Sequence, residues 1–434
     1  MRQVLLSELR PSSHRTRRST ADHVRRLMAS ISGLGFTVPI LVRENEIVDG
    51  HIRVEAAGRL GLERIPAIEV AHLDRPEIRK LSLALNRTAE LGEWDLDRLR
   101  IEITELIDLD MDLSSTGFST EDLDIILLDD GGEDEGDEDR VPQADGPPVT
   151  REGDLWLLGR HRVICGNALN PEVLRALLEG RVVHLVLTDP PYNVPIAGNV
   201  SGLGKKTHSD FRMASGEMDD VQWQAFLDNV LALLSETLVE GGVIFAFMDW
   251  RSIDRLYGAG RAAGLTLVNL VVWYKEAGAM GGLYRSAHEL VAVFCKGKTP
   301  RINNVELGRH GRNRTNVWIA PGANRPGSSA NEMLEFHATA KPCELCVDAL
   351  VDVTGPGETV LDIFLGSGTT LIAAEKTGRA CHGIEIEPRF VDVIIRRWEQ
   401  FTGQEAILAD SGESFAQVSR ARVLAAGNRE ADRD

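Results

Sequence analysis

Four consecutive residues, Asp189-Pro190-Pro191-Tyr192, could together grip a planar ring that carries an exocyclic amino group. The Asp189 carboxylate can accept hydrogen bonds from an amine, and prolines have no backbone N–H, so neighbouring carbonyls are left as acceptors. Tyr192 offers an aromatic face for stacking. Adenine and cytosine are rings of this kind. The structural alternative is a plain turn after a strand, which Asp-Pro-Pro also favours.

An apolar run at residues 182–188 comes directly before these four residues and predicts a buried strand of a parallel sheet. A strand that ends in this way would hold the four residues at the edge of a sheet. Ligands of open α/β sheets bind at that edge, outside the carboxyl ends of the strands.

A glycine loop stands between a predicted strand and a predicted helix near the end of the chain. The run is Asp362-Ile363-Phe364-Leu365-Gly366-Ser367-Gly368-Thr369-Thr370. Glycines let the backbone approach a ligand closely, and a helix N-terminus favours negative charge. The loop is neither a Walker loop nor a complete dinucleotide fingerprint. Glu385 ends the next predicted strand, 19 residues after Gly366 (385 − 366), which is close to the spacing that brings an acid to a ribose.

The two motifs, with His337-Ala338-Thr339-Ala340-Lys341-Pro342 before the second, resemble the β class of DNA amino-methyltransferases, in which the base-binding motif comes first. This resemblance implies S-adenosyl-L-methionine as cofactor, with Lys341 beside its methionine end. The class usually has Asp where Asn167 stands, at the cofactor adenine, and Asn can still accept from an amino group. The implied cofactor-binding residues are Asn167, Lys341, Asp362, Phe364, Gly366, Ser367, Gly368, Thr369, Thr370 and Glu385.

The same resemblance implies a site-specific DNA methyltransferase acting on the N6 amino group of adenine. The catalytic residues would be Asp189, Pro190, Pro191 and Tyr192. In this class, Asp as the first residue of the motif favours adenine as the target base. Three alternatives stay open. They are N4-cytosine methylation by the same site, a ParB-like DNA-binding protein with an inert methyltransferase half, and methylation of RNA or protein.

The expected fold of residues 149–412 is an α/β doubly wound, mostly parallel sheet, the fold of S-adenosylmethionine-dependent methyltransferases. Further strands are predicted at residues 243–248, 267–273 and 290–295. Residues 197–216 are rich in Gly, Ser and Lys, and we expect a mobile loop that closes over the base or the DNA.

A basic stretch follows the predicted strands and fits double-stranded DNA. Residues 296–326 carry seven Lys and Arg side chains against one acid, and such residues bind phosphate and read base edges. The position matches the target-recognition segment of the class, about residues 296–336. The predicted DNA-binding residues are Arg301, Arg309, Arg312 and Arg314. A solvated basic face is the structural alternative.

The first 90 residues resemble the ParB/sulfiredoxin-like N-terminal domain, an α+β fold. The resemblance rests on Pro39-Ile40-Leu41-Val42, on Asp49-Gly50-His51-Ile52-Arg53, on Ala56-Ala57 and on Ile65-Pro66-Ala67. Gly50, His51 and Arg53 could bind nucleotide phosphates, such as those of CTP or ATP. The sulfiredoxin cysteine is missing. A domain used only for docking is the alternative.

Composition sets the remaining expectations. The chain has 434 residues, a net charge of −18 and five cysteines. We expect a helical extension at residues 91–128, an acidic disordered linker at 129–148 and a C-terminal tail at 413–434. No metal site is expected, because Cys343 and Cys346 lack a second ligand pair. No apolar run is long enough for a bilayer, so the expected location is cytoplasmic. The oligomeric state is open, and a homodimer is one option.

Overall fold

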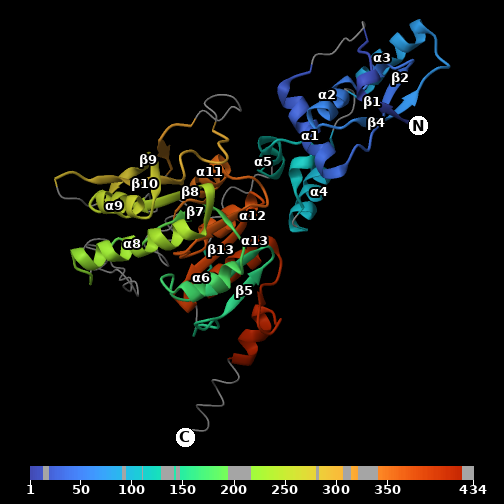
Figure 1. Cartoon of the computed structure of the whole chain (residues 1–434). Coiled ribbons are helices and arrows are strands. Elements are labelled where there is room, and N and C mark those ends of the chain that lie inside the picture. Colours follow the sequence, from blue (N-terminus) through green and yellow to red (C-terminus); the bar gives the residue numbers. More distant parts are fainter. Residues whose placement is uncertain are drawn as a thin grey trace. The chain divides into compact units, whose positions relative to one another are not determined.

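The computed structural model describes residues 1–12, 19–89, 94–109, 111–128, 141–142, 147–193, 217–279, 283–305, 314–320 and 341–422. The chain divides into two compact units, Met1–Ile126 and Leu127–Asp434. Each consists of helices packed on a sheet (Figure 1). The predicted loop at residues 197–216 lies outside the described residues, and so does most of the predicted linker at 129–148.

The first unit is built on a small sheet in the order β1-β4-β2-β3. β2 lies parallel to β4, whereas β1 pairs with β4 and β2 with β3 in antiparallel fashion. Val4, Ile40, Val42 and Ile65 form its apolar core. Its elements are β1 (Arg2–Leu5), η1 (Leu6–Glu8), α1 (Ala21–Leu34), β2 (Ile40–Arg43), β3 (Glu46–Asp49), α2 (His51–Arg59), β4 (Arg64–Glu69), α3 (Arg75–Ala89), α4 (Leu96–Asp108), η2 (Leu113–Thr116) and α5 (Thr120–Leu128).

The second unit contains a large sheet with helices on both faces (Figure 1). Its elements are β5 (Leu155–Leu158), β6 (His161–Cys165), α6 (Pro171–Leu178), β7 (Val183–Thr188), α8 (Asp220–Thr237), β8 (Leu238–Met248), α9 (Ile253–Ala262), β9 (Leu265–Ala279), β10 (Ser286–Lys296), β11 (Val317–Ile319), α11 (Cys343–Val353), β12 (Thr359–Asp362), α12 (Thr369–Lys376), β13 (Ala380–Glu385), α13 (Pro388–Thr402) and β14 (Ile407–Leu408). The three further strands predicted from the sequence are therefore present as β8, β9 and β10.

The order of the described strands in this sheet is β11-β9-β10-β8-β7-β12-β13-β6-β5-β14. The centre, from β8 through β7, β12 and β13 to β6, is parallel. On the flanks, β10 is antiparallel to both β8 and β9, and β5 is antiparallel to β6 and β14. The doubly wound α/β fold is confirmed, with a parallel centre inside a mixed sheet. At one edge, β11 is parallel to β9. β5 and β6 are joined by a short connection and are antiparallel, because a parallel pair needs a long crossover.

Alternate residues of the central strands face opposite layers of helices. Leu185 and Leu187 of β7 pack in one core with residues of α11, α12 and α13. Val186, between them, packs in a second core with residues of α6, α8 and α9. Strands buried on both faces read as continuous apolar runs, which is why the run at residues 182–188 predicted this strand correctly.

The ends of the second unit are fixed to the same core. The backbone N–H groups of Val149 and Thr150 donate to the Asp392 carboxylate of α13 at 2.6 and 2.9 Å. Phe415 and Val418 are buried in the core, so the packed structure extends past the boundary expected at residue 412. No helix among the described residues is long and apolar enough to cross a membrane.

Candidate active site

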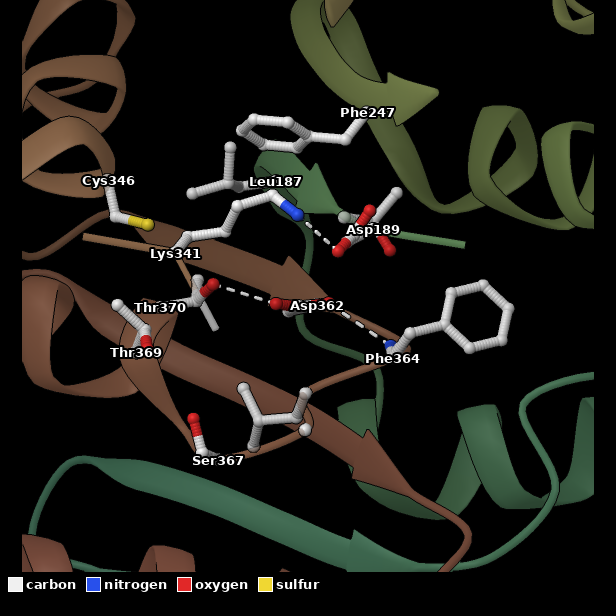
Figure 2. A pocket seen from close by; sticks show the side chains of 13 residues that line it. Leu187, Asp189, Phe247, Lys341, Cys346, Asp362, Phe364, Ser367, Thr369 and Thr370 are labelled. Carbon is white, nitrogen blue, oxygen red and sulfur yellow. Dashed lines mark hydrogen bonds and ion pairs between the residues drawn. The ribbon is translucent and has the colours of Figure 1, made fainter. Parts of the chain in front are cut away.

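Asp189 lies directly after β7, a central strand between β8 and β12. Its carboxylate is mostly buried, with 21% of the side chain exposed. Tyr192 donates its hydroxyl hydrogen to Asp189 Oδ1 at 2.7 Å, and the Lys341 ammonium donates to Asp189 Oδ2. Figure 2 shows Lys341 pointing toward Asp189 from the segment before α11. The structure thus brings together residues that two separate motifs had marked.

Two charged residues that the motifs did not mark join this group. Glu289 of β10 accepts from Lys341 Nζ at 3.3 Å and from the Tyr192 hydroxyl at 3.3 Å. Lys275 of β9 pairs with the other oxygen of Glu289. The sequence held one signal: Glu289 immediately precedes the apolar run 290–295, and Lys275 follows the run 267–273 closely. A charge at the end of a buried strand is a candidate for a site at the sheet edge.

Burial and mutual contact set the protonation of this cluster. Burial raises the pKa of the Asp189 carboxyl, against the attraction of Lys341, and Glu289 raises it further. Burial would also raise the pKa of Glu289, but Lys341 and Lys275 outweigh it and hold that pKa at about 2. Lys341 keeps its proton, because the two carboxylates raise its pKa despite burial. The cluster therefore contains one firmly ionised glutamate and one more basic aspartate.

The glycine loop joins β12 to α12 at the same edge of the sheet. Gly366 and Gly368 have φ angles of 57° and 84°, the left-handed region that glycine adopts readily. The Gly366 N–H donates to Glu385 Oε2 at 2.9 Å, and Glu385 is the last residue of β13. Asp362 accepts from the Thr370 hydroxyl at 2.7 Å and from the Phe364 N–H at 3.1 Å.

Both acids of this loop region are buried and have raised pKa values. Burial raises the pKa of Glu385 to about 7, despite two backbone N–H donors. Burial also raises the pKa of Asp362 to about 6, against the hydrogen bonds from Thr370 and Phe364. Each carboxylate oxygen can accept more than one hydrogen bond, so both acids can take further donors from a ligand.

A pocket of about 50 Å³ connects the two motifs (Figure 2). Its lining combines Asp189 and Lys341 with Asp362 and the glycine loop. Phe247 and Cys346, which belong to neither motif, also line it. The lining residues are Leu187, Thr188, Asp189, Phe247, Lys341, Cys346, Asp362, Phe364, Leu365, Gly366, Ser367, Thr369 and Thr370.

Asn167 lies beside this pocket rather than in its lining. It follows β6, the neighbour of β13, and the backbone N–H of Gly166 donates to the Glu385 carbonyl at 3.0 Å. The Asn167 side-chain oxygen accepts from the Leu169 N–H at 2.9 Å. Asn167 and Glu385 thus stand at the carboxyl ends of adjacent strands, and contact of Asn167 with the cofactor adenine stays a prediction.

The predicted DNA-binding arginines have a different setting. Arg301 pairs with Glu358, and Arg314 pairs with Asp348 and Asp352. Neither lies in the pocket lining. Arg309 and Arg312 lie outside the described residues, so DNA contact by this segment stays a prediction.

The predicted nucleotide-binding turn lies in the first unit. Gly50 precedes α2 with a φ of 96°, and Arg53 pairs with Asp49 at 2.7 Å. The His51 ring accepts from the Ser12 N–H at 3.4 Å. Nucleotide binding at this turn stays a prediction.

Within the described ranges, no group of three or more His, Cys, Asp or Glu residues could hold a metal ion. The five cysteines are buried free thiols.

Three protein-family models match segments of the chain. Residues 183–396 match a DNA methylase family, residues 97–152 a ParB-methyltransferase HTH domain, and residues 1–86 a ParB N-terminal domain. Among curated proteins, the chain is 26% identical over 264 residues to the type II methyltransferase M.HpaI of Haemophilus parainfluenzae, covering 57% of this chain and 77% of that protein.

Two solved structures are also similar. The M1.HpyAVI–SAM complex is 19% identical with a TM-score of 0.40, covering 54% of this chain and 97% of that one. The PvuII DNA methyltransferase, described as cytosine-N4-specific, is 17% identical with a TM-score of 0.44, covering 63% of this chain and 93% of that one. On the family matches, residues 183–396 belong to a DNA methylase family, and a ParB N-terminal domain precedes them in the chain.

Proposed function

We propose that this protein methylates the N6 amino group of adenine in double-stranded DNA at a specific site. The observation that carries the proposal is the buried Asp189 carboxylate, held by Tyr192 and Lys341 at the edge of the sheet, next to the glycine loop. Asp in the first position of the motif supports adenine over cytosine. The complete set of charged and aromatic residues at the site speaks against an inert methyltransferase half.

The residues around the pocket suit the cofactor chemically. Glu385 and Asp362 are buried acceptors that can take hydroxyl or amine donors, and Gly366 and Gly368 permit a close backbone approach. We assign the ribose to Glu385, the adenine to Asn167 and Phe364, and the methionine end to Asp362, Lys341 and residues 367–370. When bound, S-adenosylmethionine supplies an electrophilic methyl group, so the protein needs neither a metal nor a covalent nucleophile.

The task of the protein is then to orient the target amino group. The base leaves the duplex and stacks on Tyr192. Asp189 and the carbonyl of Pro190 accept the two amino hydrogens, which turns the nitrogen lone pair toward the methyl carbon. Such orientation supplies much of the rate of a bimolecular reaction. Asp189 is also placed to take the released proton, since its pKa is raised by burial.

The test is to express the chain in a host without DNA methylation and to analyse its digested DNA by mass spectrometry. N6-methyladenine is expected, and the Asp189→Ala variant should give none while still binding S-adenosylmethionine. In that variant Lys341 keeps Glu289 as its counter-ion, so the fold should survive. N4-methylcytosine alone would overturn the adenine assignment. No modified base at all would favour a ParB-like binding protein.

A further inference from the structure

Four side chains, one of which is the proposed catalytic carboxylate, form a closed ring of contacts. They are Asp189, Tyr192, Glu289 and Lys341. The Tyr192 hydroxyl lies 2.7 Å from Asp189 Oδ1 and 3.3 Å from Glu289 Oε2. Lys341 Nζ contacts Asp189 Oδ2 and lies 3.3 Å from Glu289 Oε2. Lys275 approaches this ring from outside and pairs with Glu289 Oε1. Asp189 and Glu289 thus share both the hydroxyl and one ammonium group.

The placement of Glu289 has no explanation in the packing of the strand. Glu289 is only 11% exposed, and it pairs across the sheet with Trp273. Burying a carboxylate is costly unless it is paired, and two well-packed apolar residues would serve stability at least as well as such an ion pair. The ammonium of Lys341 also rests over the rings of Phe247 and Trp273, at 4.7 and 5.7 Å. Lys341 is therefore fixed between an aromatic floor and two acids.

The Glu289 carboxylate changes the electrostatics of the pair that Asp189 forms with Lys341. Asp189 and Lys341 alone would form a neutral pair, and a carboxylate fully paired with an ammonium is a weak base. The target nitrogen gains positive charge as its bond to the methyl carbon forms, and a neighbouring ammonium opposes this. Glu289 adds a negative charge to the same ammonium, and Lys275 lies on the far side of Glu289. The Lys341 ammonium is thus shared by two carboxylates and does not neutralise Asp189 alone.

We propose that Glu289 is a positioning residue for methyl transfer: it shares Lys341 with Asp189 and so keeps Asp189 able to accept the proton of the target amino group. This rests on the proposed function. In the step itself, the nitrogen–carbon bond forms, the carbon–sulfur bond breaks with its electron pair remaining on sulfur, and the proton passes from nitrogen to Asp189. Among the residues that the structure describes, the charged or titratable groups that act on Asp189 are Tyr192, Lys341, Glu289 and Asp362.

The first test compares Glu289→Gln with two other variants in single-turnover methyl transfer to unmethylated host DNA between pH 5 and pH 9. The amide keeps the size and loses the charge. We expect a rate about 10²-fold lower, and the acid limb of the pH profile about one unit lower. Lys275→Met keeps the Glu289 charge and should not move the limb downward. Glu236→Gln, the same change on an exposed residue of α8, should match the wild type.

The second test needs no turnover. In the full-length chain with ¹³C-labelled aspartate carboxyls, the signal of Asp189 is identified by its loss in Asp189→Asn. Its titration midpoint should fall in Glu289→Gln and should not fall in Lys275→Met. An unchanged midpoint, or a lower rate with an unmoved acid limb, would overturn the proposal and leave Glu289 a structural role. If the wild type methylates no DNA, the proposed function fails, and the midpoint still decides the role of Glu289.

Discussion

Glu385 shows how burial prepares a single carboxylate for a ligand. It ends β13 with 8% of its surface exposed, accepts from the backbone N–H groups of Gly366 and Glu387, and has a pKa of about 7. A ribose hydroxyl donates best to the ionised form, so binding should lower this pKa and release a proton. Asp362, with a pKa of about 6, should act in the same direction.

We therefore predict that the affinity for S-adenosylmethionine rises with pH below about 7, by up to about tenfold per unit for each proton released, and levels off above. The sign follows because the ligand-free protein holds a proton on Glu385 below its pKa, and that proton must leave on binding. Calorimetry at pH 6 in two buffers of different ionisation enthalpy should detect the released proton.

Glu385→Gln is the control for this prediction. It should bind more weakly, by about 1.5–3 kcal/mol at pH 8, and its affinity should vary less with pH. An affinity for the wild type that is the same from pH 5.5 to 8.5 would show that Glu385 does not accept from the ligand in its ionised form.

At the scale of an element, the turn between β12 and α12 depends on the backbone of Gly368. Its φ is 84°, and a Cβ there would lie 3.1 Å from Ile394 Cγ1 of α13. Gly368→Ala should lower the free energy of unfolding by about 1–2 kcal/mol, the cost of left-handed backbone for an L-residue. It should also weaken cofactor binding, because the loop and the start of α12 would shift.

Gly357→Ala is a matched control for that change. Gly357 has a similar φ of 80°, but a Cβ there would meet nothing within 4 Å, and the residue lies outside the pocket lining. The free energy of unfolding of Gly357→Ala should fall by an amount comparable to that of Gly368→Ala, while its cofactor affinity should be unchanged. Denaturant unfolding and calorimetry on both variants measure the two effects. Equal affinity in both variants would show that the turn can relax without affecting the site.

At the scale of the whole molecule, the methylase unit has its own anchors. Val149 and Thr150 donate to Asp392, and the Val149 carbonyl accepts from Arg422 at 2.7 Å. All of the site residues in the pocket follow Val149 in the chain. A chain of residues 141–434 should therefore fold, bind cofactor and methylate DNA, with lower affinity for DNA or altered site choice.

A shorter chain that begins at Arg151 tests the anchors themselves. It lacks both donors to Asp392, whose buried carboxylate would lose its partners, so it should be less stable by about 1–3 kcal/mol. Turnover of each truncated chain is compared with that of the full chain on the same DNA, with and without CTP or ATP. A 141–434 chain that folds and binds cofactor but transfers no methyl group would mean that the first unit completes the active site.

The sequence by itself determined where much of the candidate site lies in the sheet. Asp189 and the glycine loop each follow a predicted strand, and Glu385 is the last residue of another. The carboxyl ends of parallel strands meet at one edge, so local patterns were enough to bring these residues together. The order of the motifs indicated the class of enzyme. Short residue runs near residue 50 indicated the ParB N-terminal domain.

Only the tertiary structure decided which charges complete the cluster. Glu289 reaches Lys341, and Lys275 reaches Glu289, because β9 and β10 form an antiparallel pair beside β8. No local pattern specifies that partner or its register. Likewise, the sequence could not show that Arg301 and Arg314 pair with Glu358, Asp348 and Asp352 within the fold. Which strands are neighbours and which charges pair depends on contacts between residues far apart in the sequence, so the packing of whole layers determines them. The end of a buried strand, by contrast, can be predicted from the residues of the strand itself.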